Sequence, residues 1–190
     1  ARSFRSQGSR TGRREAMSRD IALYGAYGQI GSILRKHWGE RVISVGENTP
    51  KRFAETVVWC ATRKPDHEDL SLYIDDTHAF MQMLLGCAIN GVRRVIFTSS
   101  FGVETDDGRT VPLNAYAAGK IAGEAFTEAW KRLGEGRSAC IIRMGGYGPL
   151  TPSGAWYEME PDEICAVYDE ALMRTGFSVL SPTWDKRPPD

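Results

Sequence analysis

The segment from Asp20 to Gly31 constrains the fold of this chain more than any other stretch. A short apolar run is followed there by glycines at positions 25, 28 and 31. The apolar run predicts a buried strand over 21–24, the glycines predict a tight turn, and the apolar spacing over 29–38 predicts a helix. A strand, a glycine-rich turn and a helix in this order are typical of the first unit of a dinucleotide-binding fold.

The three glycines have separate roles in such a turn. Gly25 permits the tight turn, Gly28 lets backbone N–H groups approach a diphosphate, and Gly31 lets the helix pack against the strand. The N-terminus of the helix then offers unpaired N–H groups and the positive end of its dipole to the phosphates. Glycines at this spacing also arise by chance, so the flanking strand and helix carry much of the prediction.

The bulk composition narrows the class of protein. A length of 190 residues suits one domain with a substantial core. Lys and Arg together number 24, as do Asp and Glu, so no net charge attracts nucleic acid or a membrane surface. No apolar run approaches the roughly 20 residues that span a bilayer, so we expect a soluble protein. The cysteines lack paired spacing, which favours buried thiols in the reducing cytoplasm over disulfides or a metal site: Cys60, Cys87, Cys140 and Cys165.

The first 17 residues differ in composition from the rest. They are rich in Arg, Ser and Gly, with Glu15 as the one acid, and predict a disordered basic leader. The composition also suits an organelle transit peptide, whereas Met17 stands where translation of a native chain could begin. Both interpretations stay open.

Beyond the first turn, strands alternate with helices. The nine residues 47–55, between the second and third strands, are too few for the crossover unit that a full doubly wound sheet has there. We therefore expect an α/β, Rossmann-like doubly wound parallel sheet that lacks one strand–helix unit. An NAD-binding domain over 18–150 and a short remnant of a substrate-binding region over 151–190 complete the expected organisation. The predicted strands cover 42–45, 56–61, 94–98, 139–144 and 177–180, and the predicted helices cover 69–90, 114–133 and 161–174.

An acidic side chain follows the second strand. Glu47 lies close to 20 residues beyond the glycine turn, where a carboxylate can accept hydrogen bonds from the adenosine ribose. The same charge would repel a 2′-phosphate by roughly 4 kcal/mol at about 4 Å and an effective dielectric near 20. Glu47 therefore favours NAD over NADP, unless it is simply a loop residue.

Three side chains near the fourth strand suggest acid/base chemistry. Tyr116 and Lys120 are four residues apart on a predicted helix and so share one face, and Ser100 closes the preceding strand. A neighbouring ammonium favours the phenolate, so we expect the pKa of Tyr116 to fall from about 10 toward neutral pH, where the residue can act as a base. Tyr116 would exchange a proton with a substrate oxygen, Ser100 would hold that oxygen, and Lys120 would also reach the nicotinamide ribose.

Together these motifs resemble the extended short-chain dehydrogenase/reductases, the NAD-dependent epimerase/dehydratase group that acts on sugars and nucleotide sugars. The resemblance covers about residues 20–175, and within the family the motifs are most similar to those of uronate dehydrogenase. It implies NAD as cofactor, a small-molecule sugar substrate and a homodimer paired through the helices that carry Tyr116 and Phe80. By position it implies catalytic roles for Ser100, Tyr116 and Lys120; cofactor contacts from Gly25, Tyr27, Gly28, Gln29, Ile30, Glu47, Ala61, Thr62, Thr98, Tyr116, Lys120 and Met144; and substrate contacts from Ser100, Phe101, Gly145 and Gly146.

Departures from the family pattern leave the substrate open. Asp76 stands where the family usually has an Asn. Residues 144–160 contain no Arg to bind a uronate carboxylate, and Gly146 stands where a serine would help to bind it. Three functions therefore stay in view. They are oxidation of a sugar or sugar acid, epimerisation or dehydration of a nucleotide sugar, and non-catalytic binding of a dinucleotide or a protein partner.

Overall fold

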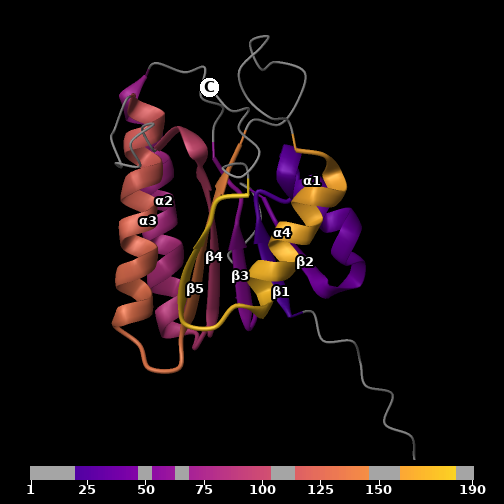
Figure 1. The fold of residues 1–190 in the computed structure, drawn as a ribbon. Coiled ribbons are helices and arrows are strands. Elements are labelled where there is room, and N and C mark those ends of the chain that lie inside the picture. The colour runs from indigo at the N-terminus through magenta and orange to yellow at the C-terminus, as the bar shows by residue number, and fades with distance from the viewer. Residues whose placement is uncertain (1–19, 47–52, 63–68, 104–113, 146–158, 183–190) are drawn as a thin grey trace, which may run out of the picture.

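The protein is built on one parallel sheet between two layers of helices (Figure 1). The computed structural model describes residues 20–46, 53–62, 69–103, 114–145 and 159–182; the predicted basic leader lies outside them. The strands are β1 (Ile21–Tyr24), β2 (Val42–Val45), β3 (Thr56–Trp59), β4 (Arg94–Ser100), β5 (Ser138–Met144) and β6 (Phe177–Leu180). The helices are α1 (Gln29–Trp38), α2 (Leu70–Ile89), α3 (Ala115–Arg132) and α4 (Pro161–Met173), with short 3-10 turns η1 (Gly39–Arg41) and η2 (Phe101–Val103).

The strand order is β2-β1-β3-β4-β5-β6, and every neighbouring pair runs parallel. From β1 the chain moves outward to β2 and then crosses back to β3 on the other side of β1. This reversal is the hallmark of a doubly wound sheet and confirms the Rossmann-like prediction. Among the described residues β2 and β6 are the two edge strands, and the position of β2 is the one that the short connection between β2 and β3 predicts.

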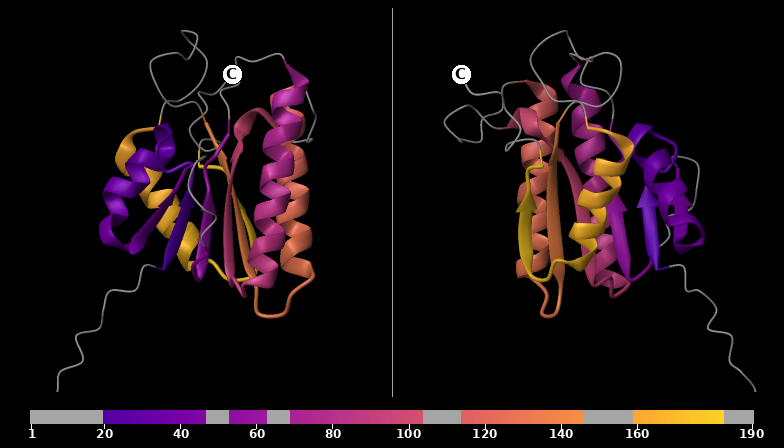
Figure 2. Two further views of the ribbon diagram at one scale, coloured as in Figure 1. Left: turned by 180° about the vertical axis from the view of Figure 1, so that it is seen from behind. Right: turned by 45° about the vertical axis from the view of Figure 1, so that its right-hand side comes forward.

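Each face of the sheet has its own core. Ile21 and Leu23 of β1 pack with α1 and α4, whereas Ala22 and Tyr24 pack with α2 and α3, because successive side chains of a strand point to opposite faces. Figure 2 shows the same two pairs of helices on opposite faces of the sheet. Since both faces are covered, the central strands are continuous apolar runs rather than alternating ones, which is why the sequence predicts them.

Two strand ends differ from the prediction, and one of them matters for the site. The strand predicted over 56–61 ends at Trp59, and the strand predicted over 94–98 continues to Ser100. The longer β4 arises because Ser99 and Ser100 pair with Arg143 and Met144 of β5. Ser100 is thus held by the sheet itself rather than by the loop that follows.

Candidate active site

The turn between β1 and α1 depends on two of its glycines. Gly25 has a φ of +78°, and a Cβ built on it would lie 2.6 Å from the backbone nitrogen of Ala61. A Cβ on Gly31 would lie 2.1 Å from the carbonyl oxygen of Gly25. Both distances are far too short for a carbon atom, so these positions need glycine for the turn and for the close approach of α1.

The N-terminus of α1 is suited to an anion. Gly28 is the N-cap residue, no side chain caps this helix, and no acidic residue lies in its first turn. Three basic residues lie in the last turn, at the negative end of the helix dipole. The first-turn N–H groups and the positive end of the dipole therefore face the carboxyl edge of the sheet, and this cradle fits the diphosphate of a dinucleotide.

The other residues predicted in this turn lie around the cradle. Tyr27 is 67% exposed, and the guanidinium of Arg35 lies 5.2 Å from the centre of its ring. Gln29 is exposed, and Ile30 packs partly into the core. Glu47, the predicted partner of the adenosine ribose, lies outside the described residues.

Ser100 and Tyr116 meet at the carboxyl edge of the sheet. Ser100 ends β4, and its Oγ accepts a hydrogen bond of 3.2 Å from the N–H of Gly102. Tyr116 is the second residue of α3, a helix capped by Asn114, whose side chain accepts from the N–H of Ala117 at 2.8 Å. The hydroxyl of Ser100 lies close enough to that of Tyr116 to lower the pKa of the tyrosine. Strand pairing and helix capping thus place the two hydroxyls together.

Lys120 lies one turn farther along α3 and is 4% exposed. Its ammonium donates a 2.7 Å hydrogen bond to the backbone carbonyl of Thr98 and lies 5.5 Å from the ring centre of Tyr116 and 5.3 Å from that of Phe97. Burial lowers the pKa of Lys120 to about 8, although the nearby Cys60, Asp76 and Glu124 oppose that fall.

The expected fall in the pKa of Tyr116 does not occur. Burial raises the pKa of Tyr116, the hydrogen bond from Ser100 lowers it in part, and the neighbouring Tyr73 raises it further. The physical reason is that the Lys120 ammonium lies over the ring and bonds to the carbonyl of Thr98, so it does not stabilise the phenolate oxygen. At neutral pH Tyr116 therefore carries its proton.

A small cavity of about 20 Å³ lies between Tyr116 and Lys120 on one side and two of the predicted cofactor contacts on the other. Tyr116 and Lys120 line it from α3, Ala61 and Thr62 from the segment after β3, and Asp76 from α2. The cavity has room for about one water molecule. Five residues chosen or flagged from the sequence are thus brought to one place.

The remaining predicted contacts fall into three groups. Phe101 and Gly145 follow the carboxyl ends of β4 and β5 and are partly exposed at the edge that carries Ser100. Thr98 and Met144 are buried, at 4% exposure each, with Met144 in the core beneath α4. Gly146 lies outside the described residues.

Two buried polar networks behind the site were not predicted from the sequence. In one, the Thr98 hydroxyl lies 2.5 Å from the Tyr168 hydroxyl and 3.2 Å from the Cys60 sulfur. In the other, Glu124 binds Arg143 and the hydroxyl of Ser99. Glu124 lies four residues after Lys120, so helical spacing could have placed it on the active face. No spacing in the sequence indicates its partners, Ser99 of β4 and Arg143 of β5.

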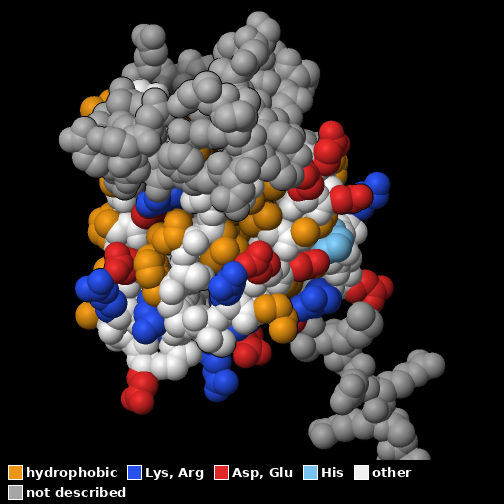
Figure 3. Space-filling view, in the orientation of Figure 1, with side chains coloured by type: hydrophobic (Ala, Val, Ile, Leu, Met, Phe, Trp, Pro, Cys, Tyr) orange, Lys and Arg blue, Asp and Glu red, His pale blue; other side chains and the backbone are white. Residues whose placement is uncertain are grey.

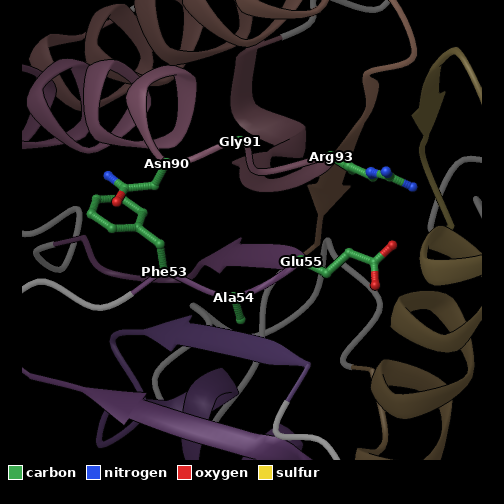
Figure 4. A pocket seen from close by; sticks show the side chains of 6 residues that line it. All are labelled: Phe53, Ala54, Glu55, Asn90, Gly91 and Arg93. Atoms are coloured by element: carbon green, nitrogen blue, oxygen red, sulfur yellow. The ribbon is translucent and has the colours of Figure 1, made fainter.

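A larger hollow lies at the opposite edge of the sheet. It has a volume of about 490 Å³ and is open and mostly polar. Figure 4 shows its lining side chains on the segments that lead into β3 and β4. Because ligands of open α/β sheets bind at the carboxyl ends of the strands, we place the candidate site at the smaller cavity. The lining residues of the hollow are Phe53, Ala54, Glu55, Asn90, Gly91 and Arg93.

The surface shows no gathering of charge of one sign on the face seen in Figure 3, where basic and acidic side chains are interspersed. Within the described part of the chain, no helix has both the length and the apolar character required to cross a membrane.

Comparison with known proteins identifies the family. The sequence model of the NAD dependent epimerase/dehydratase family matches residues 47–161, more than half of the chain. No curated protein matches the sequence. Solved structures share the fold at low identity. A UDP-galactose 4-epimerase has 18% identity and a TM-score of 0.70, and the alignment covers 86% of this chain and 77% of that one.

Two further solved structures give the same picture. MoeE5 in complex with UDP-glucuronic acid and NAD has 19% identity and a TM-score of 0.72, with 86% of this chain and 76% of that one covered. A mutated uronate dehydrogenase has 14% identity and a TM-score of 0.71, with 86% and 74% covered. The family match confirms the resemblance drawn from the motifs, and this chain belongs to the NAD-dependent epimerase/dehydratase family.

Proposed function

We propose that the protein is an NAD-dependent oxidoreductase that acts on a hydroxyl or carbonyl group of a sugar or sugar acid. The observation that carries the proposal is that Tyr116 and Lys120 line one cavity with Ala61 and Thr62, while Ser100 lies close enough to Tyr116 to lower its pKa. The family match supports NAD-dependent sugar chemistry in general. The choice of oxidation rests on the motifs that resemble uronate dehydrogenase.

Residues of the first turn would hold the cofactor. The diphosphate would lie against the N-terminus of α1 beside Gly28, because Gly25 and Gly31 keep backbone atoms close and exclude side chains there. Ala61 and Thr62 would contact the cofactor farther along, at the cavity that they share with Lys120. Glu47 would bind the adenosine ribose and favour NAD over NADP. When bound, NAD supplies the hydride acceptor or donor.

The side chains of the chain itself would move the proton. Tyr116 would exchange a proton with the substrate oxygen, and Ser100 would hold that oxygen through its hydroxyl. Because Tyr116 is protonated at neutral pH, it is ready to protonate a carbonyl oxygen, and it must release its proton before it can accept one from a hydroxyl. Lys120, mostly protonated at neutral pH because its pKa is about 8, would bind the nicotinamide ribose.

A second candidate function is epimerisation or dehydration of a nucleotide sugar. The similarity to a UDP-galactose 4-epimerase and to a complex of MoeE5 with UDP-glucuronic acid favours it, as does the absence of Arg from residues 144–160. The two reactions differ in the fate of the hydride. An oxidoreductase releases NADH, whereas an epimerase or dehydratase returns the hydride to the same sugar and retains its cofactor.

The test compares NADH release and sugar conversion in the wild type and in the variant Tyr116→Phe. The protein is incubated with NAD and panels of uronic acids, aldoses and UDP-sugars, and NADH absorbance and sugar products are both followed. Tyr116→Phe should abolish turnover and leave the NAD affinity, measured by calorimetry, nearly unchanged. Tyr73→Phe is the matched control, because it removes a hydroxyl from the ring that packs edge-on against Tyr116 at 5.9 Å.

The outcomes separate the candidate functions. Sugar-dependent NADH release supports the oxidoreductase, and conversion of a UDP-sugar without NADH release supports the epimerase or dehydratase. NAD binding without conversion of any sugar would indicate a non-catalytic dinucleotide-binding protein. Turnover retained in Tyr116→Phe would show that another group carries the proton.

We also propose a homodimer in a reducing, cytoplasmic compartment. The outer side of α2 supports the dimer, because it carries exposed apolar residues at helical spacing. The free cysteines support a reducing compartment. The exposed residues of α2 are Leu70, Ile74, Met81, Leu85 and Ile89.

A further inference from the structure

The proposed catalytic groups come from only two elements. Ser100 ends β4, whereas Tyr116 and Lys120 lie on the first two turns of α3. Their relative placement therefore depends on how α3 is seated on β4. The seating is close, because a Cβ on Gly123 of α3 would lie 2.2 Å from the ring of Phe97. A small slide of α3 along β4 would separate the hydroxyls of Ser100 and Tyr116.

A buried polar link joins the same two elements. The hydroxyl of Ser99 donates a 2.6 Å hydrogen bond to Oε1 of Glu124, and both residues are buried, at 2% and 8% exposure. Arg143 of β5 binds the same carboxylate with both arms, from Nε to Oε1 at 2.9 Å and from Nη2 to Oε2 at 2.6 Å. Ser99 precedes Ser100, and Glu124 lies one turn beyond Lys120.

We propose that Glu124 is a positioning residue that fixes α3 to the carboxyl end of β4 and so sets the distance between Ser100 and Tyr116. This inference rests on the proposed function only for its effect on turnover. Its structural part, the attachment of α3 to β4, stands apart from any reaction. Glu124 touches neither substrate nor cofactor in this role.

The chemistry of the link favours a geometric role over a stabilising one. Two charges taken from water into a protein interior lose hydration free energy that their attraction barely offsets, so a buried ion pair adds little net stability. Bidentate binding, however, fixes the direction of a carboxylate more tightly than a single hydrogen bond does. Arg143 thus holds Glu124 in the orientation in which it accepts from Ser99.

The experiment compares two double variants with the same net charge. Glu124→Gln with Arg143→Met keeps an acceptor for Ser99, whereas Glu124→Leu with Arg143→Met removes that acceptor at similar volume. Both avoid the uncompensated buried charge that a single substitution leaves. Ser99→Ala removes the same hydrogen bond from the side of β4 and leaves the ion pair in place. Asp20→Asn with Arg41→Gln is the control, because it removes a bidentate ion pair at the opposite edge of the sheet.

Hydrogen exchange of the protein without NAD or sugar decides the inference. We expect amides over 97–103 and 115–121 to exchange faster in the Leu/Met variant and in Ser99→Ala than in the Gln/Met variant and the control. Equal exchange in all four variants would overturn the attachment of α3 to β4 through Glu124. This readout does not depend on turnover, so failure of the proposed function leaves it intact.

Kinetics then test the consequence for catalysis. A misplacement of about 1 Å between reacting groups can cost on the order of 100-fold in rate, so kcat of the Leu/Met variant and of Ser99→Ala should fall by up to that factor. The KM for NAD should change less than kcat, because the diphosphate cradle lies on α1 and only the proposed contact of Lys120 with the nicotinamide ribose lies on α3. The Gln/Met variant should recover a large part of kcat. Equal kcat in the Gln/Met and Leu/Met variants would show that Glu124 does not position the site.

Discussion

The burial of Lys120 at the candidate active site lowers the stability of the folded state. Its ammonium is buried beside two aromatic rings, with one hydrogen bond to a backbone carbonyl. Burial disfavours the charged form, and the pKa of Lys120 falls from 10.5 to about 8. The folded state therefore binds this proton more weakly than the unfolded state does, and the difference is a cost to folding.

The stability of the protein should therefore depend on pH through Lys120. Below the folded pKa of about 8 both states are protonated, and the full cost applies; a pKa change of this size corresponds to about 3 kcal/mol. As the pH rises toward 10.5 the folded state loses the proton while the unfolded state keeps it, so the cost disappears. The wild type should thus gain about 3 kcal/mol relative to Lys120→Met between neutral pH and pH 10.5.

Urea unfolding of both proteins across this range measures the gain. The difference between wild type and variant cancels the titrating groups that do not interact with Lys120, and it therefore reports on Lys120 and its charged neighbours. A difference that stays constant with pH would mean that the ammonium is better solvated than its burial indicates.

At the level of single side chains, the sequence predicts which residues meet but not their environment. Tyr116 and Lys120 share a helix face because they are four residues apart, and that part is local. The pKa of Tyr116 depends on its burial and on Tyr73 from α2, and the position of the Lys120 ammonium depends on a carbonyl of β4. These contacts come from elements distant in sequence, so no local pattern indicates them.

The glycines between β1 and α1 are of two kinds: the fold requires two of them, and only ligand binding would require the third. The fold itself requires Gly25, with its positive φ, and Gly31, where a Cβ would collide with the carbonyl of Gly25. Gly28 is different, because its φ of −75° suits any residue and a Cβ there would meet that oxygen at 3.3 Å. Only a ligand at the N-terminus of α1 would make Gly28 necessary.

Substitution by alanine should separate the glycine that stabilises the fold from the glycine that NAD binding requires. Gly31→Ala should lower the free energy of unfolding by about 1–3 kcal/mol, because overpacking forces α1 away from the turn. Gly28→Ala should change stability by less than about 1 kcal/mol, yet it should weaken NAD binding more than about tenfold, the effect of about 1.4 kcal/mol. Urea unfolding and calorimetry provide the two measurements. Wild-type NAD affinity in a stable Gly28→Ala variant would show that the diphosphate does not approach Gly28.

Element order was more predictable than element ends. The apolar runs predict all six strands, and the signal is clearest for the central strands, because strands buried on both faces must be apolar throughout. The apolar run of β4 stops at Thr98, and the polar Ser99 and Ser100, which the sequence places at the close of the strand, belong to it through their pairing with Arg143 and Met144. That pairing also places Arg143 beside Ser99, and both bind Glu124, so a network that the sequence does not indicate depends on it.

At the scale of the whole molecule, the two helical layers differ in the apolar side chains that they expose. Figure 2 shows α2 and α3 side by side on one face of the sheet. The exposed apolar residues of α2 follow one another at intervals of four and seven, which places them on one side of the helix. A stripe of this kind would be covered if two copies packed α2 and α3 against each other, as the family resemblance implies.

A charge placed in this stripe should therefore change the oligomeric state. Leu85 is 56% exposed in the C-terminal half of the stripe, and Leu85→Arg would bring two like charges together across a two-fold interface. We expect the wild type to sediment as a dimer and Leu85→Arg as a monomer in analytical ultracentrifugation. Met173→Arg is the matched control, because Met173 is 82% exposed at the end of α4 on the opposite layer, and it should remain dimeric. A wild type that sediments as a monomer at every concentration, or a Leu85→Arg variant that stays dimeric, would show that α2 does not form the interface.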